Sequence, residues 1–232
     1  MNLVQRAVGA VVGSAVGDAL GAPFEFGPAG AFSSRFPVPG AGGEMSGGGG
    51  WDAGEATDDT QMAVHVAESL LERGGLDLPD IFARFQRWAA DQPKDIGLQT
   101  EDVLTRGLPW DQAAAAHYRS SHRAAGNGAL MRATPSAVYF ARDGRQATMD
   151  AARHIAALTH GDPAAWEGTA IFHDLIRVAL DGADPLDQLS QTLTLLPSRY
   201  RGRQSVVRGA LRASPRHPGR GGRVECGRGR SC

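Results

Sequence analysis

Apolar side chains recur every three or four positions through most of the chain, between short segments rich in Gly, Pro and Asp. Met62, Val66 and Leu70 form one such set, and this spacing gives an α-helix one apolar face. Helices are predicted over residues 5–20, 58–73, 79–90, 111–117, 129–141, 146–158, 163–180 and 185–195. No segment shows convincing strand alternation, so the pattern predicts an all-α domain.

The first predicted helix, residues 5–20, carries a stripe of small residues. Its glycines recur every four residues, at positions 9, 13, 17 and 21. Such a stripe lets a neighbouring backbone approach closely, so we predict a buried helix. The run is apolar enough to suggest a signal peptide or a membrane span, but its glycines and Asp18 argue against both.

Charge divides the chain into a body and a tail. Of 24 basic residues, ten arginines follow residue 196, together with a single acid, Glu225, out of 25. The body therefore carries about −10 and the tail about +9. We predict one domain over residues 1–196 and a disordered Arg/Gly-rich tail over residues 197–232, whose composition also fits translation in a shifted reading frame.

Both cysteines, Cys226 and Cys232, lie in the tail, so the body contains no disulfide or thiolate metal framework. This composition suits a cytoplasmic protein. Residues 27–54 are rich in Gly, Pro and Ser and are predicted to form an irregular loop that could become ordered around a ligand.

The most informative local pattern is the run GEATDDT over residues 54–60. The adjacent carboxylates of Asp58 and Asp59, flanked by threonine hydroxyls, supply hard oxygen ligands of the kind that Mg²⁺ prefers. The same residue types also cap helix starts and complement the helix dipole. On these residues alone capping is the stronger interpretation, and other segments are needed to favour a metal site.

Three further segments stand in a fixed order around this run. They are GSAVGDALGAPFEF over residues 13–26, GNGALMRATP over residues 126–135 and LTHGDP over residues 158–163. In this order the four motifs resemble the ADP-ribosylglycohydrolase family, which includes the dinitrogenase reductase-activating glycohydrolases. The resemblance covers about residues 5–195. It implies a compact orthogonal multi-helix bundle that hydrolyses glycosidic bonds to ADP-ribose.

The resemblance implies a two-metal Mg²⁺ or Mn²⁺ site that grips the hydroxyls of the distal ribose. Thr57, Asp58 and Asp59 match the metal-binding run of the family, and Glu25 and Asp59 are the candidate catalytic residues. Glu25 matches an acid that positions or deprotonates water, although a surface Glu in an irregular loop is an equally good interpretation of the residues alone. Its two aromatic neighbours should desolvate it and raise its pKa.

The resemblance also implies a substrate-binding set, which comprises Asp95, Gly126, Asn127, Gly128, Met131 and His160. The GNG turn would offer backbone N–H groups to the diphosphate, His160 matches a histidine that contacts the nucleotide, and Asp95 lies in an element near the ribose. Plainer alternatives stay open, namely a turn or N-cap acid for Asp95, a common turn for GNG, core packing for Met131 and a loop or cap residue for His160.

Two other motif residues have structural interpretations. Asp18 lies on the helix of small residues, where capping or pairing is favoured over a direct role because buried acids are usually partnered. Arg132 would either neutralise phosphate or pair with a structural acid.

One family element is missing, a late GDTDT run that supplies the other half of the metal ligands, because the chain contains no Asp-x-Asp. The basic tail occupies the place where it should follow. We therefore expect only half of the metal ligands and a domain that is incomplete on its C-terminal side. An apolar face left uncovered would then give marginal stability or association.

The sequence thus predicts metal-dependent hydrolysis of the bond between ADP-ribose and a modified protein side chain or small ADP-ribosyl conjugate. The alternative is a catalytically inactive module that binds ADP-ribose through residues 126–128 and His160. The expected partners are ADP-ribosylated proteins or small ADP-ribosyl molecules, with no membrane. A nucleic-acid-binding role for the arginine-rich tail is placed last, and the chain is expected to be a monomer if it folds.

Overall fold

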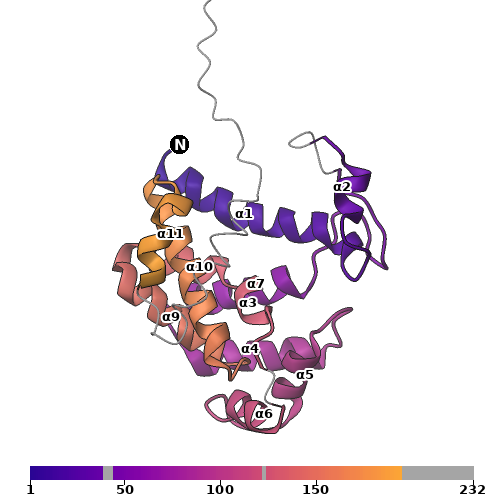
Figure 1. Ribbon diagram of the computed structural model, residues 1–232. Helices are drawn as coiled ribbons and strands as arrows, with labels where there is room; N and C mark the ends of the chain where they lie inside the picture. The colour runs from indigo at the N-terminus through magenta and orange to yellow at the C-terminus, as the bar shows by residue number, and fades with distance from the viewer. Residues whose placement is uncertain (39–43, 122–123, 195–232) are drawn as a thin grey trace, which may run out of the picture. The chain divides into compact units, whose positions relative to one another are not determined.

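The computed structural model describes residues 1–38, 44–121 and 124–194, and every regular element within them is helical (Figure 1). The helices are α1 (Leu3–Gly21), α2 (Ala31–Arg35), α3 (Asp58–Arg73), α4 (Leu78–Ala90), α5 (Leu98–Thr105), α6 (Ala113–Ser121), α7 (Gly128–Met131), α8 (Thr134–Phe140), α9 (Arg145–Ala157), α10 (Pro163–Asp181) and α11 (Pro185–Thr194). The all-α prediction is confirmed. The predicted tail, residues 197–232, lies outside the described residues.

The predicted helices differ from the observed ones in three main places, one of which is α2, a five-residue helix inside the segment 27–54 that was predicted to be irregular. The helix expected over 129–141 is split into α7 and α8, with Pro135 near the start of α8. Proline has no N–H and cannot continue an α-helical ladder, so it begins a new helix. The third difference is α5, which the pattern did not predict because only two of its three buried residues, Val103 and Leu104, are apolar.

The main core lies between α3, α4, α5, α6 and α9. Met62, Val66 and Leu70 supply the buried face of α3, as their spacing predicts, and Phe85 of α4 packs against them. The pair α9 and α10 packs beside this core, with α8 between α3 and α10. Burial of these apolar faces fixes α3, whose first turn carries the two candidate acids.

The prediction that α1 is a buried helix is wrong. Ala19 is its one buried residue, and a Cβ added at any of its four stripe glycines would meet no atom within 4 Å. Val12 is 53% exposed, and a groove of about 380 Å³ lies between α1, α3 and α8. By length and composition alone, Leu3–Phe24 is also apolar enough to cross a membrane. Within the described residues, the outer face of α1 therefore lacks a covering element.

The C-terminal end of α1 is tied to the start of α3 by Asp18. One carboxylate oxygen accepts hydrogen bonds from the backbone N–H groups of Thr57 (3.0 Å) and Thr60 (3.3 Å) and from the Thr60 hydroxyl (2.6 Å). The other oxygen accepts from the Thr57 hydroxyl at 2.7 Å. The predicted pairing role of Asp18 is confirmed, and this contact is called the Asp18 clasp below.

The Asp18 clasp should contribute more to stability than an ordinary helix cap. We expect Asp18→Ala to lower the free energy of unfolding by about 2–4 kcal/mol, because it leaves two threonine hydroxyls and two N–H groups without their acceptor. Asp162→Ala is the matched control, since Asp162 caps α10 through one bond to the Ala164 N–H and should cost only about 1 kcal/mol. Urea unfolding measures both, and equal losses would contradict the clasp.

Candidate active site

Thr57 is the N-cap of α3. Its hydroxyl oxygen accepts a hydrogen bond from the Asp59 N–H at 3.3 Å while its hydrogen goes to Asp18. The capping interpretation is therefore correct for this residue. One lone pair of the hydroxyl remains, so the role of Thr57 as a metal ligand stays a prediction.

The first turn of α3 lies among several carboxylates. The pKa of Asp58 is raised to about 6, first by burial and then by the nearby charges of Asp95, Glu25 and Asp18, while a hydrogen bond from the Gly97 N–H acts in the opposite direction. Burial likewise raises the pKa of Asp59 to about 7, with Asp58 as the largest charge contribution. Like charges in a partly desolvated place disfavour ionisation, so the fold brings these acids together at an electrostatic cost.

Glu25 follows the 3₁₀ turn Ala22–Phe24 that continues α1. Its pKa is raised by partial burial first and then by the charges of Asp95 and Asp18. The pKa of Glu25 is therefore raised, as predicted. The predicted cause, desolvation by both aromatic neighbours, is only partly right, because Phe26 is 90% exposed. Glu25 is itself exposed, so water reaches its carboxylate.

Asp95 lies before α5, half-buried, and acts on the other acids through its charge. It does not cap α5, whose N-cap is Gly97. The N-cap alternative for Asp95 is therefore wrong, and the structure places this residue with the carboxylates of α3 and Glu25.

The chemistry of these acids fits a hard divalent cation. Their oxygens are the ligand type that Mg²⁺ and Mn²⁺ prefer, and a bound cation would relieve the repulsion that raises their pKa values. Within the described ranges, however, no group of three or more His, Cys, Asp or Glu side chains is arranged so that it could hold a metal ion. The donors are thus present in one region without being gathered around one point.

The GNG segment is built around His160. A Cβ added at Gly128 would lie 3.0 Å from the Cε1 atom of His160, and one at Gly126 would lie 3.4 Å from its Nε2 atom. These glycines are needed because the histidine ring packs against their backbone. The following helix, α7, has four residues and Asn127 makes no side-chain cap, so a helix-dipole cradle for diphosphate has little support here.

His160 itself is 1% exposed, and its Nδ1 atom lies 2.8 Å from the Thr159 hydroxyl. Its pKa is lowered to about 3, first by burial and then by the charges of Arg132 and His117. The indole N–H of Trp166 donates to the His160 carbonyl. His160 is therefore a neutral, firmly held ring at physiological pH.

Arg132 takes neither of the two roles considered for it. Its side chain is fully buried, with no ion pair to any described acid. Its Nη2 atom donates to the Ile155 carbonyl (3.1 Å) and to the Thr159 hydroxyl (2.7 Å). Burial lowers its pKa to about 9, while Asp58 acts in the opposite direction. Met131 packs partly buried against the main core, as its plainer interpretation predicts.

Two further residues, Gln99 and Thr159, connect the parts of the site, and neither was predicted as a site residue from the sequence. Gln99 donates from its amide to the Ala124 carbonyl (3.2 Å) and to the Thr159 carbonyl (3.0 Å). Thr159 links Arg132 to His160. Thr159 stands in LTHGDP beside His160, so this motif is the signal that could have found it. Gln99 lies outside the four motifs, and its partners are distant in the sequence.

The chain is similar in sequence to known proteins over most of its length. The family model described as ADP-ribosylglycohydrolase matches residues 1–226. An ADP-ribosyl-[dinitrogen reductase] glycohydrolase from Rhodospirillum rubrum is 37% identical over 136 residues, which cover 57% of this chain and 44% of that protein. The ADP-ribosylarginine hydrolase Tri1 from Pseudomonas putida is 30% identical over 209 residues, which cover 84% of this chain and 52% of that protein.

A solved structure described as an ADP-ribosylglycohydrolase-related protein complex is similar with a TM-score of 0.70 at 35% identity, and the match covers 92% of this chain and 70% of that one. The chain spans about half the length of the curated relatives it matches. Because the family match continues past residue 196, the boundary between body and tail stays a prediction.

The raised pKa values predict how stability depends on pH without metal. Asp58 and Asp59 titrate at about 6 and about 7 in the fold against 3.8 when unfolded, so between these values the folded chain binds more protons. Stability should therefore fall as pH rises from about 4 to about 7. Asp59→Asn should flatten this slope and raise the melting temperature above pH 7.

The measurement is a series of thermal melts in EDTA, with Asp187→Asn on the exposed start of α11 as the control. Melting temperatures that rise through the same pH window in the wild-type chain would contradict the assignment.

Proposed function

Because the chain belongs to the ADP-ribosylglycohydrolase family, we propose that it hydrolyses the glycosidic bond between ADP-ribose and a modified protein side chain or a small ADP-ribosyl conjugate. The observation that carries this proposal is the group of acids with raised pKa values at the start of α3. Two relatives bear the names of an ADP-ribosyl-[dinitrogen reductase] glycohydrolase and an ADP-ribosylarginine hydrolase. ADP-ribosylarginine is therefore the first substrate to test.

The acids have distinct tasks in this proposal. Glu25 is exposed with a raised pKa, so it can accept a proton from a water molecule that attacks the ribose. Asp59, with a pKa of about 7, orients that water or shares its proton. A carboxylate base beside the sugar is the arrangement that glycoside hydrolysis uses in general.

A divalent cation, Mg²⁺ or Mn²⁺, would bind to Asp58, Asp59 and the free lone pair of Thr57, and when bound it would supply positive charge that orients the ribose hydroxyls. Asp95 lies close enough to influence the same carboxylates and would face the ribose. Asn127, the GNG backbone, Met131 and His160 would line the rest of the substrate site.

The remaining expectations follow from the composition and the Asp18 clasp. We propose a cytoplasmic location, because residues 1–196 lack cysteine. The chain is proposed to be a monomer. Asp18 within α1 binds Thr57 and Thr60 of the helical body, which supports packing over membrane insertion of this segment. The acidic excess of residues 1–196 argues against nucleic acid as a partner.

A second candidate function is ADP-ribose binding without cleavage. It is favoured by one structural observation, that the described residues contain no gathered metal-ligand group, and by the missing Asp-x-Asp run. This alternative needs His160 and the GNG turn but not the acids of α3.

The test is release of ADP-ribose from ADP-ribosylated arginine and serine peptides, with Mg²⁺, with Mn²⁺ and with EDTA. We expect metal-dependent release that falls at least about a hundredfold in Asp58→Asn plus Asp59→Asn, because both changes remove cation ligands. Asp111→Asn, which changes an exposed acid before α6, should behave as wild type. Undiminished turnover in EDTA would contradict the proposal, and metal-independent binding without release would establish the second function instead.

A further inference from the structure

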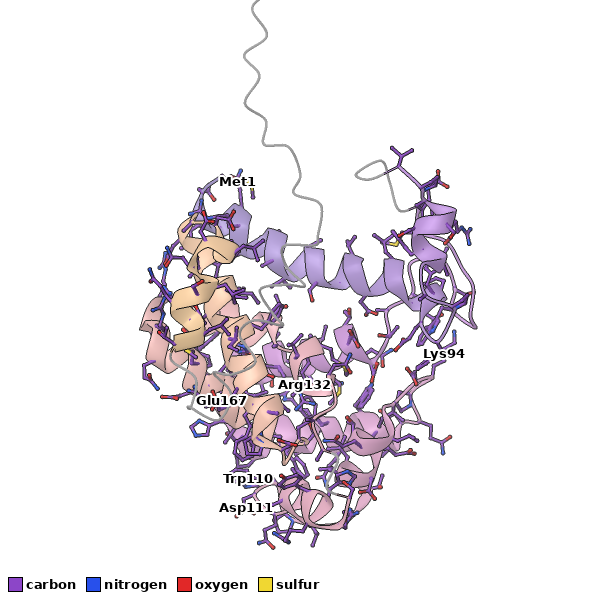
Figure 2. All side chains as sticks on the ribbon, viewed as in Figure 1. Met1, Lys94, Trp110, Asp111, Arg132 and Glu167 are labelled. Carbon is purple, nitrogen blue, oxygen red and sulfur yellow. The ribbon has the colours of Figure 1, made fainter. Side chains whose placement is uncertain are left out.

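Arg132 is a buried cation held by neutral partners. Figure 2 labels Arg132, whose side chain is among the sticks drawn on the helical ribbon. Its guanidinium carbon lies 4.7 Å from the ring centroid of Phe85, and the residue is 0% exposed. Its Nε atom has no hydrogen-bond partner among the described residues. Burying a charge without a paired anion is costly, and the two hydrogen bonds that Nη2 donates offset part of that cost.

The Thr159 hydroxyl has a defined proton arrangement. Its oxygen accepts from Arg132 Nη2 at 2.7 Å, and arginine can only donate. Within the described part of the chain, the other atom within hydrogen-bond distance of this oxygen is Nδ1 of His160, at 2.8 Å. If Nδ1 carried a hydrogen, two donors would face the same oxygen and the buried hydroxyl hydrogen would have no acceptor. The hydroxyl therefore donates to Nδ1.

An Nδ1 atom that accepts places the ring hydrogen of neutral His160 on Nε2. This atom lies at the GNG turn, where a Cβ added at Gly126 or Gly128 would be 3.4 or 3.3 Å away. No hydrogen bond between described residues involves Nε2. The missing Cβ atoms thus allow the backbone of the GNG turn to approach the Nε2 edge of the ring closely.

We propose that Arg132 is a positioning residue which acts through Thr159 to hold His160 as the neutral Nε2–H tautomer, so that His160 donates a hydrogen bond to an acceptor atom of the ADP-ribosyl group at the GNG turn. This inference rests on the proposed function for its ligand, but the tautomer itself is a property of the free chain. The low pKa of His160 is consistent with it, because the ring stays neutral throughout the working range.

The chain contains an internal reference for the opposite tautomer. His173 is also buried, and its Nδ1 atom donates to the Thr169 carbonyl at 3.0 Å. Because that carbonyl can only accept, the ring hydrogen is on Nδ1. The Nε2 atom lies 2.8 Å from the Ser136 hydroxyl, whose single hydrogen is shared between Nε2 and the Ala133 carbonyl at 2.9 Å. His173 should therefore be the Nδ1–H tautomer, and burial keeps it neutral by lowering its pKa to about 4.

The experiment reads both tautomers by ¹⁵N NMR of the histidine-labelled full chain at pH 7 without substrate, with assignment by His160→Gln and His173→Gln. We expect His160 as Nε2–H and His173 as Nδ1–H. Thr159→Val should remove the preference of His160 and leave His173 unchanged, whereas Thr159→Ser should retain the wild-type tautomer. Arg132→Met should shift His160 in the same direction as Thr159→Val, and the Thr159 variants alone decide the matter if Arg132→Met does not fold.

Calorimetry with ADP-ribose measures the consequence for binding. Thr159→Val should weaken affinity about tenfold, with Thr159→Ser close to wild type. An Nδ1–H tautomer of His160 in the wild-type chain, or an unchanged tautomer in Thr159→Val, would overturn the inference. A wild-type chain with the expected tautomer that binds no ADP-ribose would overturn the proposed function and the donor role while leaving the tautomer assignment in place.

Discussion

The Asp18 clasp is the contact on which the arrangement of the candidate site depends. One carboxylate at the end of α1 accepts hydrogen bonds from both Thr57 and Thr60, so the first turn of α3 can begin only where α1 places it. That turn presents Asp58 and Asp59 to Glu25 and Asp95. The raised pKa values are the electrostatic cost of holding these like charges close together, and core packing along the rest of α3 offsets that cost.

Arg132 joins the acidic region to the histidine region. Its charge is stabilised by Asp58 on one side and disfavours protonation of His160 on the other. Because it is buried, its field is weakly screened, and its N–H groups are fixed by Phe85, Ile155 and Thr159. One cation thus helps to determine the charge state of the His160 ring, to which the Thr159 hydroxyl links it.

The ends of a helix could be predicted from the sequence where residues that start and stop helices stand at both of its ends. The bounds of α3 were predicted because Thr57 caps its start and Gly74, at φ 68°, ends it. Local patterns could not show that the glycine stripe of α1 would face open space, since that depends on which elements cover it. The roles of Thr159 and Gln99 were missed for the same reason, because their partners lie far away in the sequence. The segments of the site could therefore be predicted from the sequence, whereas the contacts between them depend on how the chain folds.

The central proposal is that the acids brought together by the Asp18 clasp form a divalent-cation site. Its most direct test is anomalous diffraction from crystals of the chain soaked in Mn²⁺. We expect a peak within coordination distance of Asp58 and Asp59, which is lost in crystals of Asp58→Asn plus Asp59→Asn. A well-ordered crystal with no peak at the start of α3, under Mn²⁺ concentrations that label other surface acids, would contradict it.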